Sequence, residues 1–344
     1  MTKKIIIIIL VASFGLFLSI RPYYLFLTQT LKISPVKTLF SSDSLKTYKD
    51  QVNVLILGIA GENHDGPNLS DSIIVANYDI KNNQMTTVSI PRDIWSDTLK
   101  DKINSAYAYG EAKQKGGGLK LAKAEVSAII GQPIQYAAVI DFDKFKTLID
   151  YLGGLDVEVS RSFTDKEFPI AGKENNLCNG DPEYRCRYET ISFSKGLTHM
   201  DGETALKYVR SRHAQDSEGS DFARGQRQQE VIKALKNKVV DIVKTGRLNE
   251  ISGLYQELNK LIGRDITNQQ VAIVAKNIFL KKDFQQKQIS LTDDFFIVPQ
   301  YYLYDGKYVL IPESGDFETI HEYINCHIEN KKNCEPLKKE SKEN

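Results

Sequence analysis

The sequence predicts an α/β protein whose folded body is one domain built around a mixed central sheet. Short apolar runs typical of buried strands alternate along the chain with segments of helical periodicity, and no internal repeat is evident. The composition agrees, because 41% hydrophobic and 26% charged residues are ordinary for a globular protein with a substantial core. An apolar segment at the N-terminus precedes this domain.

Residues 1–27 are predicted to be a short cytoplasmic N-terminus followed by a transmembrane helix. Two lysines precede an uncharged apolar run from Ile5 to Ile20, which as a helix would be ~24 Å long, slightly short of a ~30 Å hydrocarbon core. Arg21 could extend its charged end to the interface, so that the span reaches Leu27. A cleaved signal peptide is the alternative, but no convincing small-x-small cleavage site follows the run.

The elements of the folded domain are predicted from local patterns. Residues 28–50 are mixed and polar and are expected to be a linker, followed by a domain over 51–325 with its core at 51–240. Strands are expected at 52–59, 72–78, 85–90, 136–141 and 155–159, with shorter ones at 288–291, 301–304 and 308–311. Helices are expected at 119–130, 142–152, 201–209, 221–244, 248–262, 267–281 and near 317–328. Residues 160–200 are expected to be irregular, and 326–344 to be a charged tail.

Two pairs of cysteines indicate an oxidising compartment. Cys178 and Cys186 lie eight residues apart, as do Cys326 and Cys334, and neither pair has CxxC spacing. No histidine has the spacing to complete a zinc site. Two local disulfides fit best, with four unrelated free thiols as the alternative. We therefore expect the body of the protein to lie outside the membrane.

A pair of aspartates is the first candidate site. If strands 72–78 and 85–90 form an antiparallel hairpin centred near Asn82, the register places Asp71 opposite Asp93 at the open end. Cross-strand partners lie ~4.5–5.5 Å apart at Cβ, so two carboxylates there would repel each other. Mg²⁺ or Mn²⁺ would remove this conflict, because hard cations prefer oxygen ligands. The alternative is one aspartate beside a strand and another in an ordinary turn.

Arginines form a second candidate site, for phosphate. Pro91 ends its strand, so Arg92 and Asp93 project from a sheet end, where α/β proteins commonly bind ligands. An arginine beside a metal-binding aspartate suits a pyrophosphate, and a surface ion pair is the alternative.

A longer basic segment, 207–238, contains eight Lys/Arg against four Asp/Glu. Arginines there continue the apolar stripe of the helix at 221–244 into its first turns, where the helix dipole repels cations unless an anion is bound. A solvated basic face is the alternative. The residues that we expect to form this phosphate site are Arg210, Arg212, Arg224, Arg227 and Gln228.

The overall charge argues against nucleic acid as a partner. The formal net charge is +1, and the sequence has no C2H2 spacing, RNA-binding aromatic signature or basic arm. The aspartate pair and the arginines together make a metal-plus-arginine pyrophosphate site, which is mainly what phosphoryl transfer needs. The residues alone therefore indicate a phosphate-handling ectodomain.

These motifs resemble the LytR-CpsA-Psr (LCP) family. The matching stretches occur in family order over roughly residues 51–240 and include VNVLILG, SDSIIVANY, SIPRD, KINSAYAYG, GETALKYVRSRH and SDFARGQRQQEVI. The resemblance implies an α/β/α fold with a hydrophobic pocket for a polyprenyl tail. It also implies transfer of a glycan phosphate from polyprenyl pyrophosphate to a wall acceptor such as peptidoglycan, with release of polyprenyl phosphate.

The resemblance further implies roles for particular residues. Asp71 and Asp93 would bind Mg²⁺, and Asp93 is also a candidate to deprotonate the acceptor hydroxyl. Lys102 and Asn104 would shape the pocket or have a structural role. The pyrophosphate would be held by Arg92, Arg210, Arg212, Arg224 and Arg227, with Gln228 nearby.

Two positions depart from the family pattern. Leu69 stands where many members have an arginine, and the family's aspartate soon after the first strand is replaced in Ile59–Glu62. The loop Glu62–Asn68 could compensate, with His64 or Asp65 as substitutes.

Three functions remain open at this point. They are the transferase, a polyprenyl-pyrophosphate hydrolase in which water replaces the acceptor, and a non-catalytic lipid-binding or regulatory ectodomain. In each case we expect a single-pass protein of the cell membrane with its domain outside the cytoplasm.

Overall fold

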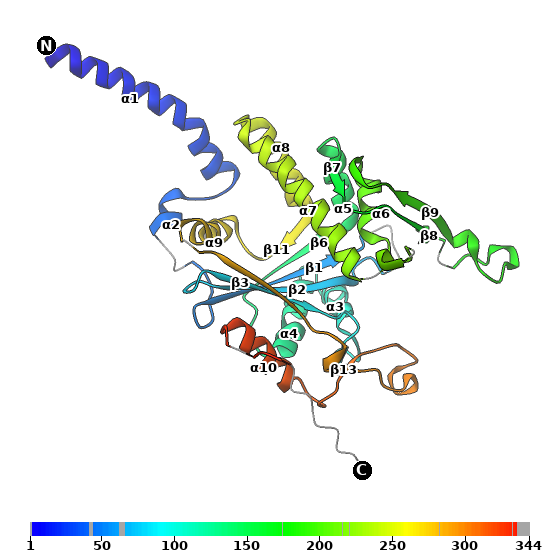
Figure 1. Ribbon diagram of the computed structural model, residues 1–344. Coiled ribbons are helices and arrows are strands. Elements are labelled where there is room, and N and C mark those ends of the chain that lie inside the picture. The colour runs from blue at the N-terminus through cyan, green and yellow to red at the C-terminus, as the bar shows by residue number, and fades with distance from the viewer. Residues whose placement is uncertain are drawn as a thin grey trace.

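The computed structural model describes residues 2–40, 44–61, 66–173, 175–214, 216–219, 221–281, 283–331 and 333–335. Among them a mixed sheet of six strands lies at the centre, in the order β11-β6-β1-β2-β3-β12 (Figure 1). Neighbouring strands are antiparallel except for the pairs β1–β6 and β3–β12, which are parallel. The strands are β1 (Gln51–Ile59), β2 (Ser70–Asp79), β3 (Gln84–Ile90), β6 (Tyr136–Asp141), β11 (Ile262–Arg264) and β12 (Gln285–Ser290). The predicted α/β fold with a mixed central sheet is confirmed.

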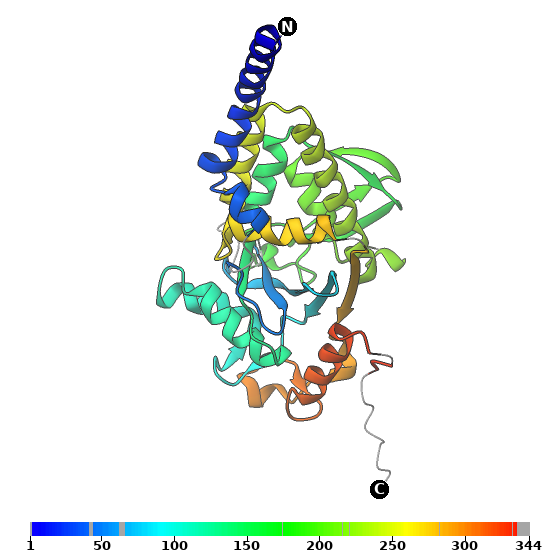
Figure 2. The same ribbon diagram turned by 90° about the vertical axis from the view of Figure 1, so that its left-hand side faces the viewer.

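Helices cover both faces of the sheet (Figures 1 and 2). One apolar core joins the sheet to α3 (Ala106–Lys113), α4 (Gly118–Ile130) and α10 (Glu318–Ile328). A second core lies among the helices on the other face and the small sheet that they enclose. Its elements are α5 (Phe142–Tyr151), α6 (Gly202–Arg210), α7 (Asp221–Lys244), α8 (Leu248–Leu261), β7 (Leu155–Val159) and β10 (Gly196–Met200).

The segment 160–200, expected to be irregular, contains three paired strands, β8, β9 and β10. β8 (Phe163–Pro169) and β9 (Tyr188–Phe193) form an antiparallel ribbon, and the Cys178–Cys186 disulfide lies in the connection between them. Phe163, Phe168 and Phe193 are buried. Their apolar side chains hold the ribbon against the second core, which accounts for the order in a segment rich in turn residues.

The prediction of two short strands near the C-terminus, at 301–304 and 308–311, was wrong. Tyr301–Tyr304 is a 3-10 turn, and at 308–311 only Ile311 enters a strand, β14 (Ile311–Pro312), which pairs with β13 (Phe296–Ile297). Tyrosines favour strands statistically, but that preference reflects packing on a half-buried sheet surface. Here Tyr301 and Tyr302 are exposed, so no such packing acts on them.

The N-terminal segment is the helix α1 (Thr2–Leu25). In the part of the chain that the structure describes, no helix is both long enough and apolar enough to cross a membrane, so the expected transmembrane helix is not supported there.

The described residues of the expected linker 28–50 include a segment, 34–40, that is packed against the domain. It contains α2 (Pro35–Phe40), which lies beside α9 (Asn268–Leu280). The backbone N–H of Ser34 donates to the Gln269 amide oxygen at 2.7 Å, and the Gln269 amide donates to the Thr38 hydroxyl at 2.8 Å. Side chains of α9 thus satisfy backbone and hydroxyl groups of the segment, which fixes it in place.

Both expected disulfides are present, Cys178–Cys186 and Cys326–Cys334. The second joins the last turn of α10 to the segment that follows it. The N-terminal part of the expected tail is therefore tied to the domain, and residues 336–344 lie outside the described part of the chain.

We predict that the native protein has no reactive thiol. Titration with a thiol reagent should count none in the native state and four after denaturation with reductant, because all four cysteines are paired. Four reactive thiols in the native protein would contradict both disulfides and the inferred oxidising compartment.

Candidate functional site

The hairpin of β2 and β3 positions the first set of site residues. Its register pairs Ile73 with Ile90 and Asp79 with Gln84, one residue away from the predicted register. The connecting turn accounts for the shift, because Asn83 adopts a left-handed φ of 51° and the turn is centred just before Asn82. Continuing this register beyond the last pair brings Arg92, rather than Asp93, opposite Asp71.

Four charged side chains meet at the open end of this hairpin. Arg92 Nη1 forms an ion pair with Asp71 Oδ1, and Arg92 Nε lies 3.7 Å from Asp93 Oδ2. Lys102 Nζ donates to Asp93 Oδ1 at 2.7 Å. The two carboxylates therefore converge as predicted, but two cations neutralise them. All four side chains are partly exposed, so the set is open to solvent and to a ligand.

The aspartate pair fits a magnesium ion only in part. Among the described residues no group of three or more His, Cys, Asp or Glu side chains could hold a metal ion. Mg²⁺ is commonly bound by one or two carboxylates, with waters and substrate phosphates as its other ligands. Asp71 and Asp93 thus suit an ion that arrives with a phosphate ligand, whereas a metal held by protein side chains alone would need more donors.

The segment after the aspartate pair holds it in place through its backbone. The N–H of Ile103 donates to the carbonyl of Ile94 at 2.7 Å, and the N–H of Asn104 donates to the carbonyl of Arg92 at 3.2 Å. Lys102 and Asn104 therefore differ in role here. The side chain of Lys102 reaches the site, while Asn104 supports the strand end through its backbone.

The predicted arginine site divides into exposed and buried residues. Arg210 ends α6, and Arg212 follows it; both are exposed, while Arg224 in the first turn of α7 is partly buried. Gln228, expected on the inward face, is exposed. The buried face of α7 runs through Arg227, Val231 and Ala234, and this helix phase turns Gln228 outward.

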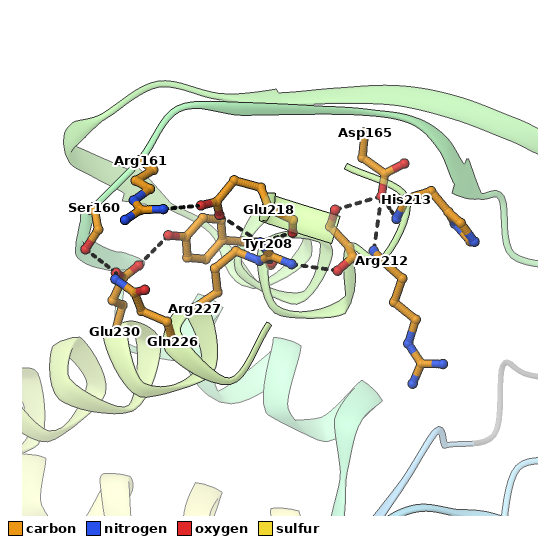
Figure 3. A network of polar contacts seen from close by, with 11 residues as sticks. Ser160, Arg161, Asp165, Tyr208, Arg212, His213, Glu218, Gln226, Arg227 and Glu230 are labelled. Atoms are coloured by element: carbon orange, nitrogen blue, oxygen red, sulfur yellow. Dashed lines mark hydrogen bonds and ion pairs between the residues drawn. The ribbon is translucent and has the colours of Figure 1, made fainter. Parts of the chain in front are cut away.

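Arg227 is buried and bonded to the protein itself. It is 2% exposed, and its guanidinium donates to the carbonyls of Tyr208 at 3.1 Å, Ser211 at 2.7 Å and Glu218 at 2.9 Å (Figure 3). Burial lowers the pKa of Arg227, and the nearby Glu218 carboxylate opposes that shift. The family resemblance implied that Arg227 binds the pyrophosphate directly. That role does not match this geometry, because the guanidinium nitrogens of Arg227 already donate to the protein.

Asp165 is a site residue that the sequence did not reveal. It is 0% exposed, and its Oδ2 accepts from the Ser211 hydroxyl at 2.7 Å and from the backbone N–H groups of Arg212 and His213 at 3.2 and 3.1 Å. Figure 3 shows that Asp165 and Arg227 both bond to the same short segment, and that the side chain of Arg212 points away from it. An aspartate in the buried phase of β8, two residues after Phe163, was the available signal.

A polar hollow lies beside Arg227, lined by residues that include Ser160, Tyr208 and Glu230. Tyr208 and Ser160 both donate hydrogen bonds to the Glu230 carboxylate. Burial, followed by the bond to Glu230, raises the pKa of Tyr208, so the phenol stays protonated. This lining does not suit an isoprenoid chain, so the apolar pocket expected for a polyprenyl tail stays a prediction.

Of the two departures from the family pattern, the structure describes Leu69 in full. Leu69 is half-buried, and its N–H donates to the carbonyl of Gly66 at 2.9 Å, so it closes a turn at the start of β2. His64 and Asp65, considered as substitutes for the absent aspartate, lie outside the described residues.

Comparison with known proteins decides the family. The family model described as the LytR_cpsA_psr family matches residues 28–321. The chain belongs to the LytR_cpsA_psr family. The match begins within the segment expected to be a linker, in agreement with its packing against α9.

Named relatives and a solved structure are similar to this chain. The chain is 30% identical over 251 residues to the polyisoprenyl-teichoic acid–peptidoglycan teichoic acid transferase TagU of Bacillus mycoides, covering 71% of each chain. It is 30% identical over 295 residues to the enzyme of the same description, TagV, of Bacillus subtilis, covering 82% of this chain and 66% of TagV. The crystal structure of B. subtilis TagV matches with a TM-score of 0.51 and 25% identity, over 82% of this chain and 99% of that one.

The contrast between Arg227 and Arg212 gives a test of their roles. We predict that Arg227→Ala lowers the free energy of unfolding by about 3 kcal/mol, because it leaves Glu218 and three carbonyls without their buried partner. Arg212→Ala should change it by less than about 1 kcal/mol, because its side chain is exposed. Chemical denaturation of the two variants measures both values. Unchanged stability of Arg227→Ala, with weaker pyrophosphate binding, would restore the role that the family resemblance implied.

Proposed function

We propose that this protein is a phosphotransferase that moves a glycan phosphate from polyprenyl pyrophosphate to a wall acceptor such as peptidoglycan and releases polyprenyl phosphate. The observation that carries the proposal is the convergence of Asp71, Arg92, Asp93 and Lys102 at the open end of the β2–β3 hairpin. The names of TagU and TagV support it, since both relatives are described as polyisoprenyl-teichoic acid–peptidoglycan teichoic acid transferases.

In the proposed reaction the acceptor hydroxyl attacks the phosphorus that carries the glycan. A P–O bond forms to the acceptor, the bond from that phosphorus to the bridging oxygen breaks, and polyprenyl phosphate leaves with the electron pair. Asp93 is the candidate base for the hydroxyl proton, since its carboxylate is partly exposed beside two cations. Arg92 and Lys102 are the groups best placed to neutralise the phosphate oxygens.

Asp71 and Asp93 are the residues that we propose to hold Mg²⁺ or Mn²⁺, which would supply charge neutralisation for the two phosphates. Arg92 and Lys102, which pair with these carboxylates in the structure, would then be released to the phosphate oxygens. The exposed Arg210 and Arg212 and the partly buried Arg224 are the further candidates for pyrophosphate contacts.

We predict metal-dependent release of polyprenyl monophosphate from a polyprenyl-pyrophosphate-linked sugar when peptidoglycan is present as acceptor. Asp93→Ala and Arg92→Ala should each lower the rate by about 10²- to 10³-fold, the usual effect of removing a group that stabilises charge in the transition state. Thin-layer chromatography of the lipid product measures the release in parallel reactions.

The controls separate the three candidate functions. Omitting the acceptor, or adding EDTA, should abolish release by the wild type, and Mg²⁺ or Mn²⁺ should restore it. Release without acceptor would identify a hydrolase instead. Tight lipid binding with no release by any variant would identify a carrier or regulatory protein.

We further propose that the protein is held at the cell membrane by residues 1–27, with its domain outside the cytoplasm. The uncharged run from Ile5 to Ile20 and the two disulfides support this placement.

We predict that the full-length chain sediments with membranes and resists extraction with high salt, and that deletion of residues 1–27 releases it into the soluble fraction. Protease added to intact spheroplasts should digest the domain of the full-length protein. Protection of the domain under these conditions would place it in the cytoplasm and contradict the proposal.

A further inference from the structure

Exposed aromatic and aliphatic side chains gather in one short segment beside the candidate site, residues 297–308, here called the aromatic loop. Its exposed large apolar residues are Ile297, Val298, Tyr301, Tyr302, Leu303 and Tyr308, and Tyr302 is 76% exposed. Soluble proteins rarely expose contiguous apolar groups in an ordered segment unless a ligand or partner covers them.

The aromatic loop is held firmly at its base and at its tip. β13 and β14 pair on either side of it, and Val309 just beyond it is fully buried. Within the loop the N–H of Gly306 donates to the carbonyl of Tyr301 at 2.9 Å. Tyr304 packs edge-on against Trp95, with ring centroids 4.9 Å apart. The exposed rings are therefore presented by a preformed structure, which lowers the entropic cost of binding a ligand.

The loop is joined directly to the candidate site. The N–H of Leu310, just after the loop, donates to the carbonyl of Asp93 at 2.9 Å, and the N–H of Trp95 donates to the carbonyl of Leu310 at 2.9 Å. Lys102 lies between the two surfaces, with its Nζ 2.7 Å from Asp93 Oδ1 and 5.9 Å from the centroid of the Tyr308 ring. A ligand on the Tyr308 ring would thus be separated from the Asp93 carboxylate by a single side chain, that of Lys102.

Polar groups with fixed charges lie at the C-terminal end of the aromatic loop, around Lys307. Lys307 Nζ donates to Asp101 Oδ1 at 2.7 Å, and Tyr109 also donates to Asp101. Partial burial alone would raise the pKa of Asp101, but the hydrogen bonds from Lys307 and Tyr109 lower it, so the carboxylate is ionised and able to accept hydroxyl groups. A loop that offers tyrosine faces together with such acceptors and donors matches a pyranose chain, whose C–H faces alternate with hydroxyls.

The position of the loop separates a glycan from a lipid surface as its ligand. In both views the loop lies at the end of the molecule opposite α1 (Figures 1 and 2). Attachment to a bilayer through α1 would therefore hold the rings on the side away from the lipid, where a wall polymer is found.

We infer that the aromatic loop binds a glycan chain, the acceptor of the transfer reaction, with Tyr301 and Tyr302 as stacking residues and Asp101 and Lys307 as hydrogen-bonding residues. This inference rests on the proposed function, because it assigns the acceptor side of that reaction. It places the acceptor hydroxyl beside Asp93, on the face of the site reached through Lys102.

The chain carries its own probe for this binding. Trp95 is the one tryptophan in the sequence, and it contacts Tyr304 of the loop. Titration of the wild type with soluble peptidoglycan glycan strands should give a saturable change in Trp95 fluorescence. The double variant Tyr301→Ala/Tyr302→Ala should bind at least about tenfold more weakly, the loss expected for removal of two stacking rings. Tyr301→Phe/Tyr302→Phe, which keeps the rings, should retain most of the binding.

A matched control is Tyr184→Ala, which removes an exposed tyrosine from the connection between β8 and β9 and should bind like the wild type. Equal glycan affinity of the wild type and the double alanine variant would overturn the inference. So would a Trp95 response to phosphatidylglycerol vesicles but not to glycan strands.

The same variants separate this inference from the proposed function. In the release assay the double alanine variant should raise KM for the acceptor at least about tenfold while kcat and donor binding stay unchanged. Release by the wild type with an unaltered acceptor KM in the variant would leave the transferase standing and reject the glycan site. Ring-dependent glycan binding without any release would leave the glycan site standing and reject the transferase.

Discussion

The antiparallel pairing of β2 with β3 is the constraint on which the candidate site depends. Side chains alternate across a strand, so a register shift of one residue changes which group faces Asp71. In the observed register Arg92 faces Asp71, and Asp93 follows beside Lys102. Two carboxylates can then stand at one end of a hairpin without a metal ion, because each already has a cation. The site is electrically balanced before any ligand arrives, and a pyrophosphate bound as proposed would compete with the aspartates for the same cations.

Buried charge organises the segment between α6 and α7 in a different way. Arg227 and Asp165 are withdrawn from solvent, and each bonds to backbone groups of the segment between α6 and α7. A guanidinium with fixed donors and a carboxylate with fixed acceptors define that segment more tightly than apolar packing would. The exposed Arg210 and Arg212 are thereby carried on a backbone with little freedom, which the proposed role in pyrophosphate binding would require.

Much of the fold could be predicted from the sequence, because its longer strands and helices have clear apolar periodicity. The hairpin was predicted correctly, whereas its register depended on the left-handed Asn83, which no local pattern reveals. The metal-binding role of Asp71 and Asp93 stays a prediction. An arginine that binds a ligand and one that binds carbonyls look alike in sequence, so Arg227 was expected in the wrong environment. Tyr301–Tyr304 was expected as a strand because tyrosine propensity says nothing about whether a neighbouring strand is available.

The packing of residues 31–38 against α9 also bears on how the domain is oriented. Asn268 donates to the carbonyl of Leu31 at 2.7 Å, and Gln269 bonds to both Ser34 and Thr38. These bonds fix residues 31–38, a few residues after α1 ends at Leu25, to the body of the protein. A surface that holds α1 would therefore also limit how far the open end of the β2–β3 hairpin can lie from it. The candidate site would then stay within a limited distance of that surface, and its substrates would have to reach it there.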